Sequence, residues 1–250
     1  MFLGHYQYET IRDNRSIICL LKNYKKVTEM TKKRASPYVW VTWLSRLMAG
    51  ETPCQWSPWF KTHYTGYDKV PSGFQSAIWI AQHTEMVDKL AKQRLALGET
   101  VFKEEQNSFN VKRKSGLLVA GKPDLIAINE AEQYTVYDAK TGSQSNSHSI
   151  QVMLYMMFLP YARSSYKNRV FEGCVIYSDG QTHDIPSAAV DDVKETITYF
   201  LDILESLEPP KPTASFENCK FCNIGDSDCL NRCKTNVPEI IDGYEPDMPF

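Results

Sequence analysis

The spacing of apolar positions changes along the chain, and these changes predict the order of the secondary-structure elements. Between Ser72 and Gly98 apolar residues recur every three or four positions, which predicts a long amphipathic helix capped by Ser72 and ended by Gly98. Three β-prone stretches follow at 100–110, 116–128 and 133–140, and a polar turn joins the last two. This part of the chain is therefore predicted to be one helix and three strands.

The remaining apolar segments complete an α/β pattern. A helix is predicted at about 148–162, a strand at 169–178 and a helix at about 188–207. Residues 37–64 are rich in aromatic side chains and contain a predicted helix that stops near Gly50. The core order is thus helix, three strands, helix and strand, which indicates the α/β fold class.

Length and composition favour an ordinary globular protein. The 250 residues can bury a full core, and the hydrophobic fraction of 42% and charged fraction of 23% are typical of soluble domains. The sequence has no apolar run that could span a bilayer and no secretory apolar region near its start. We therefore expect a cytoplasmic protein without a membrane partner.

Charge is distributed unevenly, although the net charge is only -2. Residues 22–34 hold six basic residues and one Glu, whereas residues 235–250 hold four acidic residues and no Lys or Arg. A basic segment of this kind is usually a solvated helix face. Contact with nucleic-acid phosphates is the alternative.

The cysteines suggest bound metal rather than disulfides. Their number is odd, seven, and a chain without a signal peptide is not expected to carry a disulfide framework. Cys54 stands apart, Cys19 and Cys174 lie in apolar runs as expected of core residues, and four cysteines crowd one short segment: Cys219, Cys222, Cys229 and Cys233. A C-x2-C pair suits either an iron–sulfur cluster or zinc.

Two acidic residues lie inside β-prone runs, where a carboxylate is costly without a partner. They are Asp124 in "GKPDLI" and Asp138 in "VYDAK". Residues two apart on a strand share a face, so Asp138 and Lys140 project together, and Asp124 faces the same point if the two strands form a hairpin. Converging carboxylates need a cation, and Mg²⁺ or Mn²⁺ is the expected one.

An Asp, an Asp and a Lys around such a metal suit phosphodiester hydrolysis. The metal polarises the phosphoryl oxygen and acidifies a bound water, and the ammonium orients that water and offsets charge in the transition state. The ordinary alternative is that Asp138 and Lys140 are solvent-facing residues at the end of a strand.

"GKPDLI" followed by "YDAK" resembles the P-D…(D/E)-x-K signature of the PD-(D/E)XK nuclease superfamily, whose core has the αβββαβ order. His83 in "AQHTEMVDKL" resembles the metal-binding histidine of the RecB/AddB-like branch, which includes the CRISPR-associated RecB-like exonucleases. Gln151 and Tyr155 in "SIQVMLYMMF" resemble its Q-x-x-x-Y motif. The resemblance spans about 72–178 and implies a restriction-endonuclease-like core, with a central mixed sheet flanked by helices.

The resemblance also implies roles for individual residues. The metal ligands would be His83, Asp124, Asp138 and the carbonyl of Ala139, and the other catalytic residues would be Lys140, Gln151 and Tyr155. Lys140 would assist the attacking water, while Gln151 and Tyr155 would position the scissile strand. The alternatives are that His83 is a surface or satisfied helix residue and that Tyr155 packs in the core.

Some nucleases of this branch hold an iron–sulfur cluster with one cysteine before the core and three after it. The resemblance implies a [4Fe–4S] cluster on Cys54, Cys219, Cys222 and Cys229, which would clip a helical N-terminal cap to the C-terminal segment. The last spacing is one residue longer than the family pattern, so Cys233 is an alternate ligand. A local zinc site on the four C-terminal cysteines is the competing interpretation.

Together the residues and the resemblance predict a Mg²⁺- or Mn²⁺-dependent DNA exonuclease acting on single-stranded or frayed ends. A helicase or CRISPR adaptation proteins are the partners to expect. The alternatives are a non-catalytic nucleic-acid-binding or adaptor module with a zinc site, and a restriction-type endonuclease, which would usually need a target-recognition insertion. The expected segments are an aromatic N-terminal segment, a nuclease core, a cysteine segment and an acidic tail: 1–70, 71–207, 208–236 and 237–250.

Overall fold

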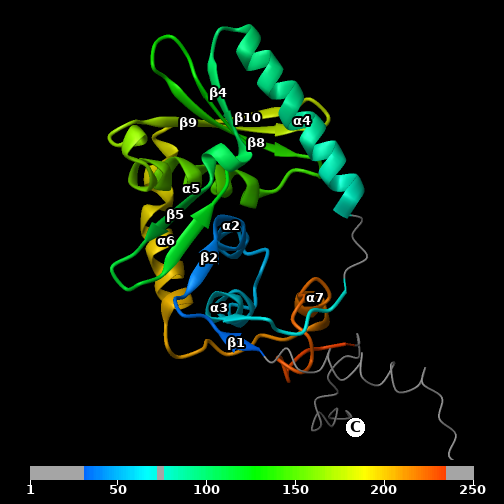
Figure 1. Ribbon diagram of the computed structural model, residues 1–250. Coiled ribbons are helices and arrows are strands. Elements are labelled where there is room, and N and C mark those ends of the chain that lie inside the picture. The colour runs from blue at the N-terminus through cyan, green and yellow to red at the C-terminus, as the bar shows by residue number, and fades with distance from the viewer. Residues whose placement is uncertain (1–30, 72–75, 235–250) are drawn as a thin grey trace, which may run out of the picture.

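A five-stranded sheet forms the centre of the fold in a computed structural model that describes residues 31–71 and 76–234. Strands β8 and β9 are parallel, and the other neighbouring pairs are antiparallel, so the sheet is mixed (Figure 1). The strand order is β10 (Thr182–Ile185), β9 (Phe171–Tyr177), β8 (Tyr134–Lys140), β7 (Leu125–Ile128) and β4 (Thr100–Lys103). This confirms the predicted α/β class and the predicted hairpin between the second and third strands.

Helices cover both faces of this sheet because its strands are apolar on both faces. Leu125 and Ala127 pack with Leu90 of α4 (Ser76–Ala96), whereas Ile126 and Val136 belong to the cluster that includes α5 (Asn146–Ala162). Neighbouring residues on a strand point to opposite faces, so α4 and α5 lie on opposite sides. α5 is also the crossover between the parallel strands β8 and β9.

Close packing of α5 on the sheet depends on one glycine. A Cβ at Gly173 of β9 would lie 2.4 Å from Val152 Cγ1 and 2.7 Å from Met156 Sδ, both on α5. Only a residue without a side chain allows this approach.

A three-stranded sheet joins the N-terminal segment to the core. Its order is β2 (Tyr38–Trp40), β6 (Leu118–Gly121) and β5 (Phe109–Lys112), with β2 parallel to β6. The aromatic N-terminal segment therefore shares a sheet with strands of the predicted nuclease core. The helices α2 (Val41–Met48) and α3 (Trp56–His63) follow β2 and pack against α6 (Ala189–Glu205).

Two predicted strands are wrong as single elements. The stretch 100–110 is β4, a 3₁₀ helix at Glu104–Asn107 and β5, and Glu104 adopts a left-handed φ of 37° where the chain leaves one sheet for the other. The stretch 116–128 is β6 and β7, separated at Pro123, which has no N–H for a strand ladder. Strand β10 was not predicted, because "THDI" is short and largely polar.

The predicted helix ends at Gly50 and Gly98 are confirmed, since both glycines follow their helices with positive φ, 74° and 81°. The predicted elements at 148–162, 169–178 and 188–207 are confirmed to within two residues at each end. Ser72, Cys19, residues 22–30 and the tail 235–250 lie outside the described residues. Of the basic segment, Lys32–Lys33 forms strand β1, paired with β3 (Tyr64–Thr65), so this part is not a helix face.

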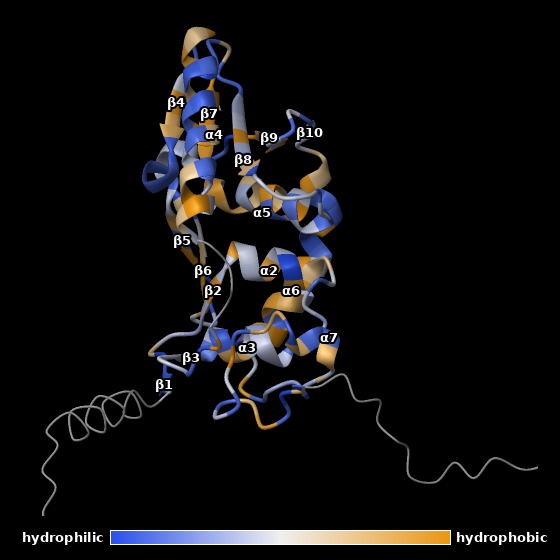
Figure 2. Ribbon diagram, turned by 90° about the vertical axis from the view of Figure 1, so that its right-hand side faces the viewer, coloured by the Kyte–Doolittle hydropathy of each residue, from blue (hydrophilic) through white to orange (hydrophobic). Residues whose placement is uncertain are grey.

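The C-terminal cysteine segment lies close to the N-terminal segment that contains α3. In both views α7 (Phe216–Cys219) lies near α3 at the end of the molecule away from β4 (Figure 1, Figure 2). Of the helices in the described ranges, none has both the length and the apolar character needed to cross a membrane.

Candidate active site

The β7–β8 pairing brings the first carboxylate to the second strand. Leu125 pairs with Tyr137, and Asp124 just before it accepts a hydrogen bond on Oδ2 from the Ala139 N–H at 2.7 Å. The same oxygen lies 3.2 Å from His83 Nε2 of α4. Asp124 and His83 are both buried. The sheet and the helix above it thus hold an imidazole against a carboxylate.

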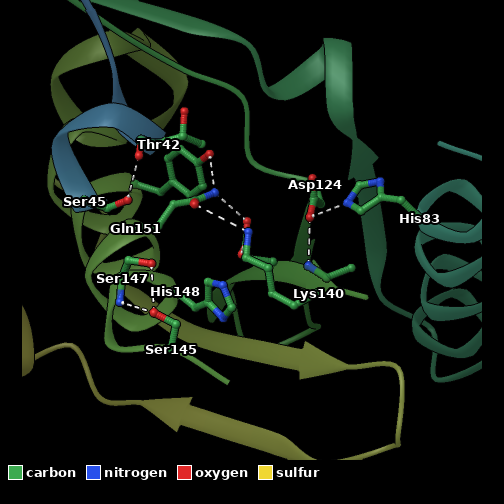
Figure 3. A network of polar contacts seen from close by, with 12 residues as sticks. Thr42, Ser45, His83, Asp124, Lys140, Ser145, Ser147, His148 and Gln151 are labelled. Carbon is green, nitrogen blue, oxygen red and sulfur yellow. Dashed lines mark hydrogen bonds and ion pairs between the residues drawn. The ribbon is translucent and has the colours of Figure 1, made fainter. Parts of the chain in front are cut away.

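Asp138 and Lys140 occupy the same face of β8, as the alternation of side chains requires. Lys140 Nζ lies 2.6 Å from Asp138 Oδ2 and donates a longer bond of 3.4 Å to Gln151 Oε1. Gln151 Nε2 donates to Asp138 Oδ1 at 2.9 Å and to the Tyr155 hydroxyl at 3.0 Å (Figure 3). The Tyr155 hydroxyl donates to the Lys122 carbonyl at 3.4 Å.

Gln151 and Tyr155 reach this network because they are four residues apart on α5 and share one helix face. Tyr155 is also buried against Phe109, with ring centroids 6.2 Å apart. A Cβ at Gly121 would lie 2.5 Å or less from the Phe109 ring and 2.9 Å from the Tyr155 ring, so a glycine is needed beside the pair. Tyr155 therefore packs in the core and takes part in the polar network at once.

Burial and the neighbouring charges together set the protonation of Asp138 and Lys140. Burial raises the pKa of Asp138 to about 6, against the Lys140 ammonium, which lowers it, and with the Asp124 carboxylate, which raises it further. Burial alone would lower the pKa of Lys140, but Asp138 and Asp124 raise it above its ordinary value, so the ammonium stays charged. The hydrogen bond to Asp124 raises the pKa of His83. The site thus concentrates charge where solvent is scarce.

The donor chemistry of these residues fits a hard divalent cation. Asp138 Oδ2 is buried, and within the described part of the chain it has the Lys140 ion pair but no aligned hydrogen bond. Two carboxylates and a backbone carbonyl supply the oxygen ligands that Mg²⁺ or Mn²⁺ prefers, and the imidazole adds a nitrogen donor. Among residues 31–71 and 76–234, no group of three or more His, Cys, Asp or Glu side chains is arranged so that it could hold a metal ion.

All predicted nuclease-core site residues line one cavity of about 640 Å³: His83, Asp124, Asp138, Ala139, Lys140, Gln151 and Tyr155. Further residues line it that the sequence did not single out: Trp40, Trp79, Lys122 and His148. His148 precedes Gln151 by three positions on α5, so helical spacing alone could have placed it there. Its Nδ1 lies 3.2 Å from the Tyr177 hydroxyl. Glu104 also lines the cavity, whereas Glu105 pairs with Lys122 at 3.0 Å.

A comparison with known protein families identifies the superfamily of this chain. Residues 26–227 match the family model described as the PD-(D/E)XK nuclease superfamily. The chain belongs to this superfamily. Its members are nucleases that generally use divalent metals such as Mg²⁺, so membership indicates a nuclease that acts on nucleic acid. Asp124, Asp138 and Lys140, the residues that resemble the P-D…(D/E)-x-K signature, all line the cavity.

Other comparisons add little to the superfamily assignment. No curated protein matches the chain. A solved structure described as "Crystal structure of SSO0001" is 14% identical over 85% of this chain and 95% of that one, with a TM-score of 0.42. At this level of likeness the assignment to the PD-(D/E)XK superfamily rests on the family model.

A second cluster of chemistry-bearing residues lies at the other end of the chain. Burial raises the pKa of the Cys229 thiol, and Cys219, Cys222 and Cys54 raise it further, so these three cysteines lie within electrostatic range of Cys229. The Cys233 N–H donates to Cys219 Sγ at 3.4 Å. By contrast, Cys174 is buried in β9 beside α4, as expected of a core residue.

The cysteine segment is fastened to the residues that follow α3. Val70 N–H donates to the Asn223 carbonyl at 3.0 Å, and Gly225 N–H donates to the Asp68 carbonyl at 2.8 Å. Arg232 donates to three carbonyls within the segment, those of Cys219, Cys222 and Ile224, at 3.1, 2.8 and 2.7 Å. The residues that follow α3 and the C-terminal cysteine segment are therefore joined by backbone hydrogen bonds, without a disulfide among the described cysteines.

Proposed function

We propose that this superfamily member is a Mg²⁺- or Mn²⁺-dependent deoxyribonuclease, a RecB-like exonuclease acting on single-stranded or frayed DNA ends. The observation that carries the proposal is the meeting of Asp124, Asp138 and Lys140 in one cavity. The RecB-like assignment is supported by His83 against Asp124 and by Gln151 against Asp138, since these contacts come from the two additional motifs.

The contacts of each side chain support a separate role for it in the reaction. His83, Asp124, Asp138 and the Ala139 carbonyl would hold the ion, which when bound polarises the scissile phosphoryl group and acidifies water. Lys140 keeps its charge beside Asp138 and is placed to orient the attacking water and to offset charge on the phosphorane-like transition state. Gln151 fixes Asp138 and Lys140 in one hydrogen-bonded arrangement, so it positions both.

Tyr155 contributes to the site by holding Gln151 in place. Its hydroxyl accepts a hydrogen bond from the Gln151 amide and donates one to the Lys122 carbonyl, which ties α5 to the connection between β6 and β7. We assign Gln151 and Tyr155 to positioning the scissile strand and the pair of Asp138 and Lys140 rather than to proton transfer.

The cysteines are proposed to hold a [4Fe–4S] cluster on Cys54, Cys219, Cys222 and Cys229, with Cys233 as an alternate to Cys229. The electrostatic neighbourhood of Cys229, which includes Cys54, supports this ligand set over the local zinc site of the four C-terminal cysteines. The cluster would be structural and would close a long loop of the chain, which lowers the entropy of the unfolded state. A helicase or CRISPR adaptation proteins are the partners that the RecB-like resemblance supports.

A cleavage assay tests the nuclease. We expect end-labelled linear single-stranded DNA to be degraded with Mg²⁺ or Mn²⁺, circular DNA to resist, and EDTA to stop the reaction. Asp138→Ala and Lys140→Ala should abolish cleavage, whereas the matched changes Asp192→Ala and Lys112→Ala at exposed positions should not. Full activity of Asp138→Ala would overturn the site. Cleavage of the circle would exclude a pure exonuclease, and binding without cleavage would favour the adaptor alternative.

A further inference from the structure

The first turns of α4 expose apolar side chains at the edge of the active-site cavity. Ile78, Trp79 and Ile80 are 54%, 39% and 54% exposed. Trp79 and Ile80 line the cavity, whereas Ile78 does not. In Figure 2 most of α4 is hydrophilic, and the end that bears these residues is coloured as hydrophobic. Large apolar side chains that are exposed at the edge of a cavity indicate a surface that binds a ligand or a partner.

Trp79 is held in a fixed orientation beside a catalytic group. Its indole stacks on the His83 imidazole one helical turn further on, with ring centroids 5.0 Å apart and planes inclined by 23°. His83 in turn contacts Asp124. The indole therefore lies one side chain away from the Asp124 carboxylate, and Trp79 lines the cavity while it is 39% exposed.

A second indole lines the cavity from a different element. Trp40 is the last residue of β2 and is braced edge-on by Tyr38, with centroids 5.6 Å apart. Figure 3 shows Thr42, at the start of α2, and His83, on α4, on opposite sides of Lys140 and Asp124. One Trp from the β2–α2 junction and one from α4 thus line the same cavity as Asp138 and Lys140.

We propose that Trp79, together with Trp40, stacks the bases of a single-stranded DNA whose phosphodiester lies at Asp138 and Lys140. This rests on the proposed nuclease function and deepens it. Stacking on an aromatic side chain requires an unpaired base, because bases in a duplex are already stacked and paired. Any base can stack, so such a site accepts all sequences but discriminates against duplex. A cavity of about 640 Å³ is of the size that holds a small ligand rather than a double helix.

Binding to two matched oligonucleotides tests the proposal. The probes are a fluorescent oligothymidylate and an oligonucleotide of equal length in which every nucleotide is abasic, measured by anisotropy in EDTA so that neither is cleaved. Stacking is worth about 1–3 kcal/mol per base, so Trp79→Ala should weaken oligothymidylate binding about 5- to 150-fold. Binding of the abasic strand should not change, because it offers phosphates without bases.

Two further variants separate stacking from structure. Trp79→Phe keeps an aromatic face and should recover most of the affinity. Ile78→Ala, at a more exposed neighbour outside the cavity, should bind both probes as the wild type does. Trp40→Ala should repeat the base-dependent loss.

Equal losses for both probes, or no loss for Trp79→Ala, would overturn the stacking assignment. So would a wild type that binds blunt duplex as tightly as the single strand. A wild type that degrades DNA while Trp79→Ala loses nothing rejects this inference alone. A wild type that neither binds nor cleaves DNA rejects the proposed function itself.

Discussion

The ionisation of Asp138 should make the stability of the metal-free protein depend on pH in a specific direction. Burial raises its pKa from 3.8 to about 6, although the Lys140 ammonium at 2.6 Å favours the charged form. A pKa difference of about 2 corresponds to about 3 kcal/mol, because each pKa unit is worth about 1.4 kcal/mol. Burial is thus expected to outweigh the ion pair at this carboxyl.

The sign follows from proton linkage. A carboxyl whose pKa is higher in the folded state binds more protons there than in the unfolded chain, so its contribution to stability is full below pH 3.8 and is lost as the pH rises to about 6. We expect the free energy of unfolding of the wild type, relative to Asp138→Asn, to fall by about 3 kcal/mol across this window. Asp138→Asn serves as the reference because its side chain at position 138 cannot titrate. Any constant difference in stability between the two proteins does not affect the change with pH.

Urea unfolding of both proteins in EDTA, from pH 4 to pH 7, measures this difference. Adding Mg²⁺ at pH 7 should raise the stability of the wild type and not that of Asp138→Asn, because a cation bound to the folded state alone stabilises it. Asp192→Asn, at an exposed position, is the control and should follow the wild type. A difference that rises with pH would refute the reasoning, since it would mean that the Lys140 ion pair wins over burial.

Three other predictions concern the packing of α5, the cysteines and the basic residues 32–34. Gly173→Ala should lower the free energy of unfolding by about 1–3 kcal/mol, measured in urea, because the new Cβ would lie 2.4 Å from Val152 Cγ1. Cys54→Ala should lose the iron and the visible absorbance of anaerobically purified protein, while Cys174→Ser keeps both; zinc bound equally well without Cys54 would contradict the cluster. Changing the basic residues 32–34 to Glu should weaken DNA binding and flatten its salt dependence more than it lowers stability.

The sequence was sufficient for the parts of the site that depend on local spacing. Asp138 and Lys140 share a face because a strand has a period of two, and Gln151 and Tyr155 share one because a helix has a period near four. The β7–β8 hairpin could be predicted because a polar turn joins two apolar runs. These spacings are properties of neighbouring residues, so no knowledge of the tertiary structure was needed.

Contacts between distant segments could not be predicted in the same way. Trp40 reaches the cavity because β2 pairs with β6 about eighty positions later, and no local pattern specifies that register. Strand β10 forms because β9 offers it an edge, although "THDI" has little β-propensity of its own. In both cases the decisive term is tertiary pairing.

The wrong boundaries of two predicted strands and the position of the cavity have one cause, the crossing of the chain between the two sheets. The chain crosses from one sheet to the other at Glu104 and again at Pro123, and a backbone hydrogen bond of 2.9 Å from the Glu104 N–H to the Asp124 carbonyl joins the two crossings. Asn107, fully buried, braces them by donating to the Pro123 carbonyl at 3.3 Å.

Where the chain passes from one sheet to the other, strand pairing and the run of apolar residues are interrupted. Polar side chains that would be costly in the middle of a buried strand can therefore lie there. Glu104, Lys122 and Asp124 all line the cavity, and all three lie at these interruptions. The costly carboxylate at Asp124 is therefore tolerated because the backbone there is already turning away from the sheet, and its oxygen finds the Ala139 N–H of β8. The interruptions that make strand prediction fail in this chain are also the places where its candidate active site forms.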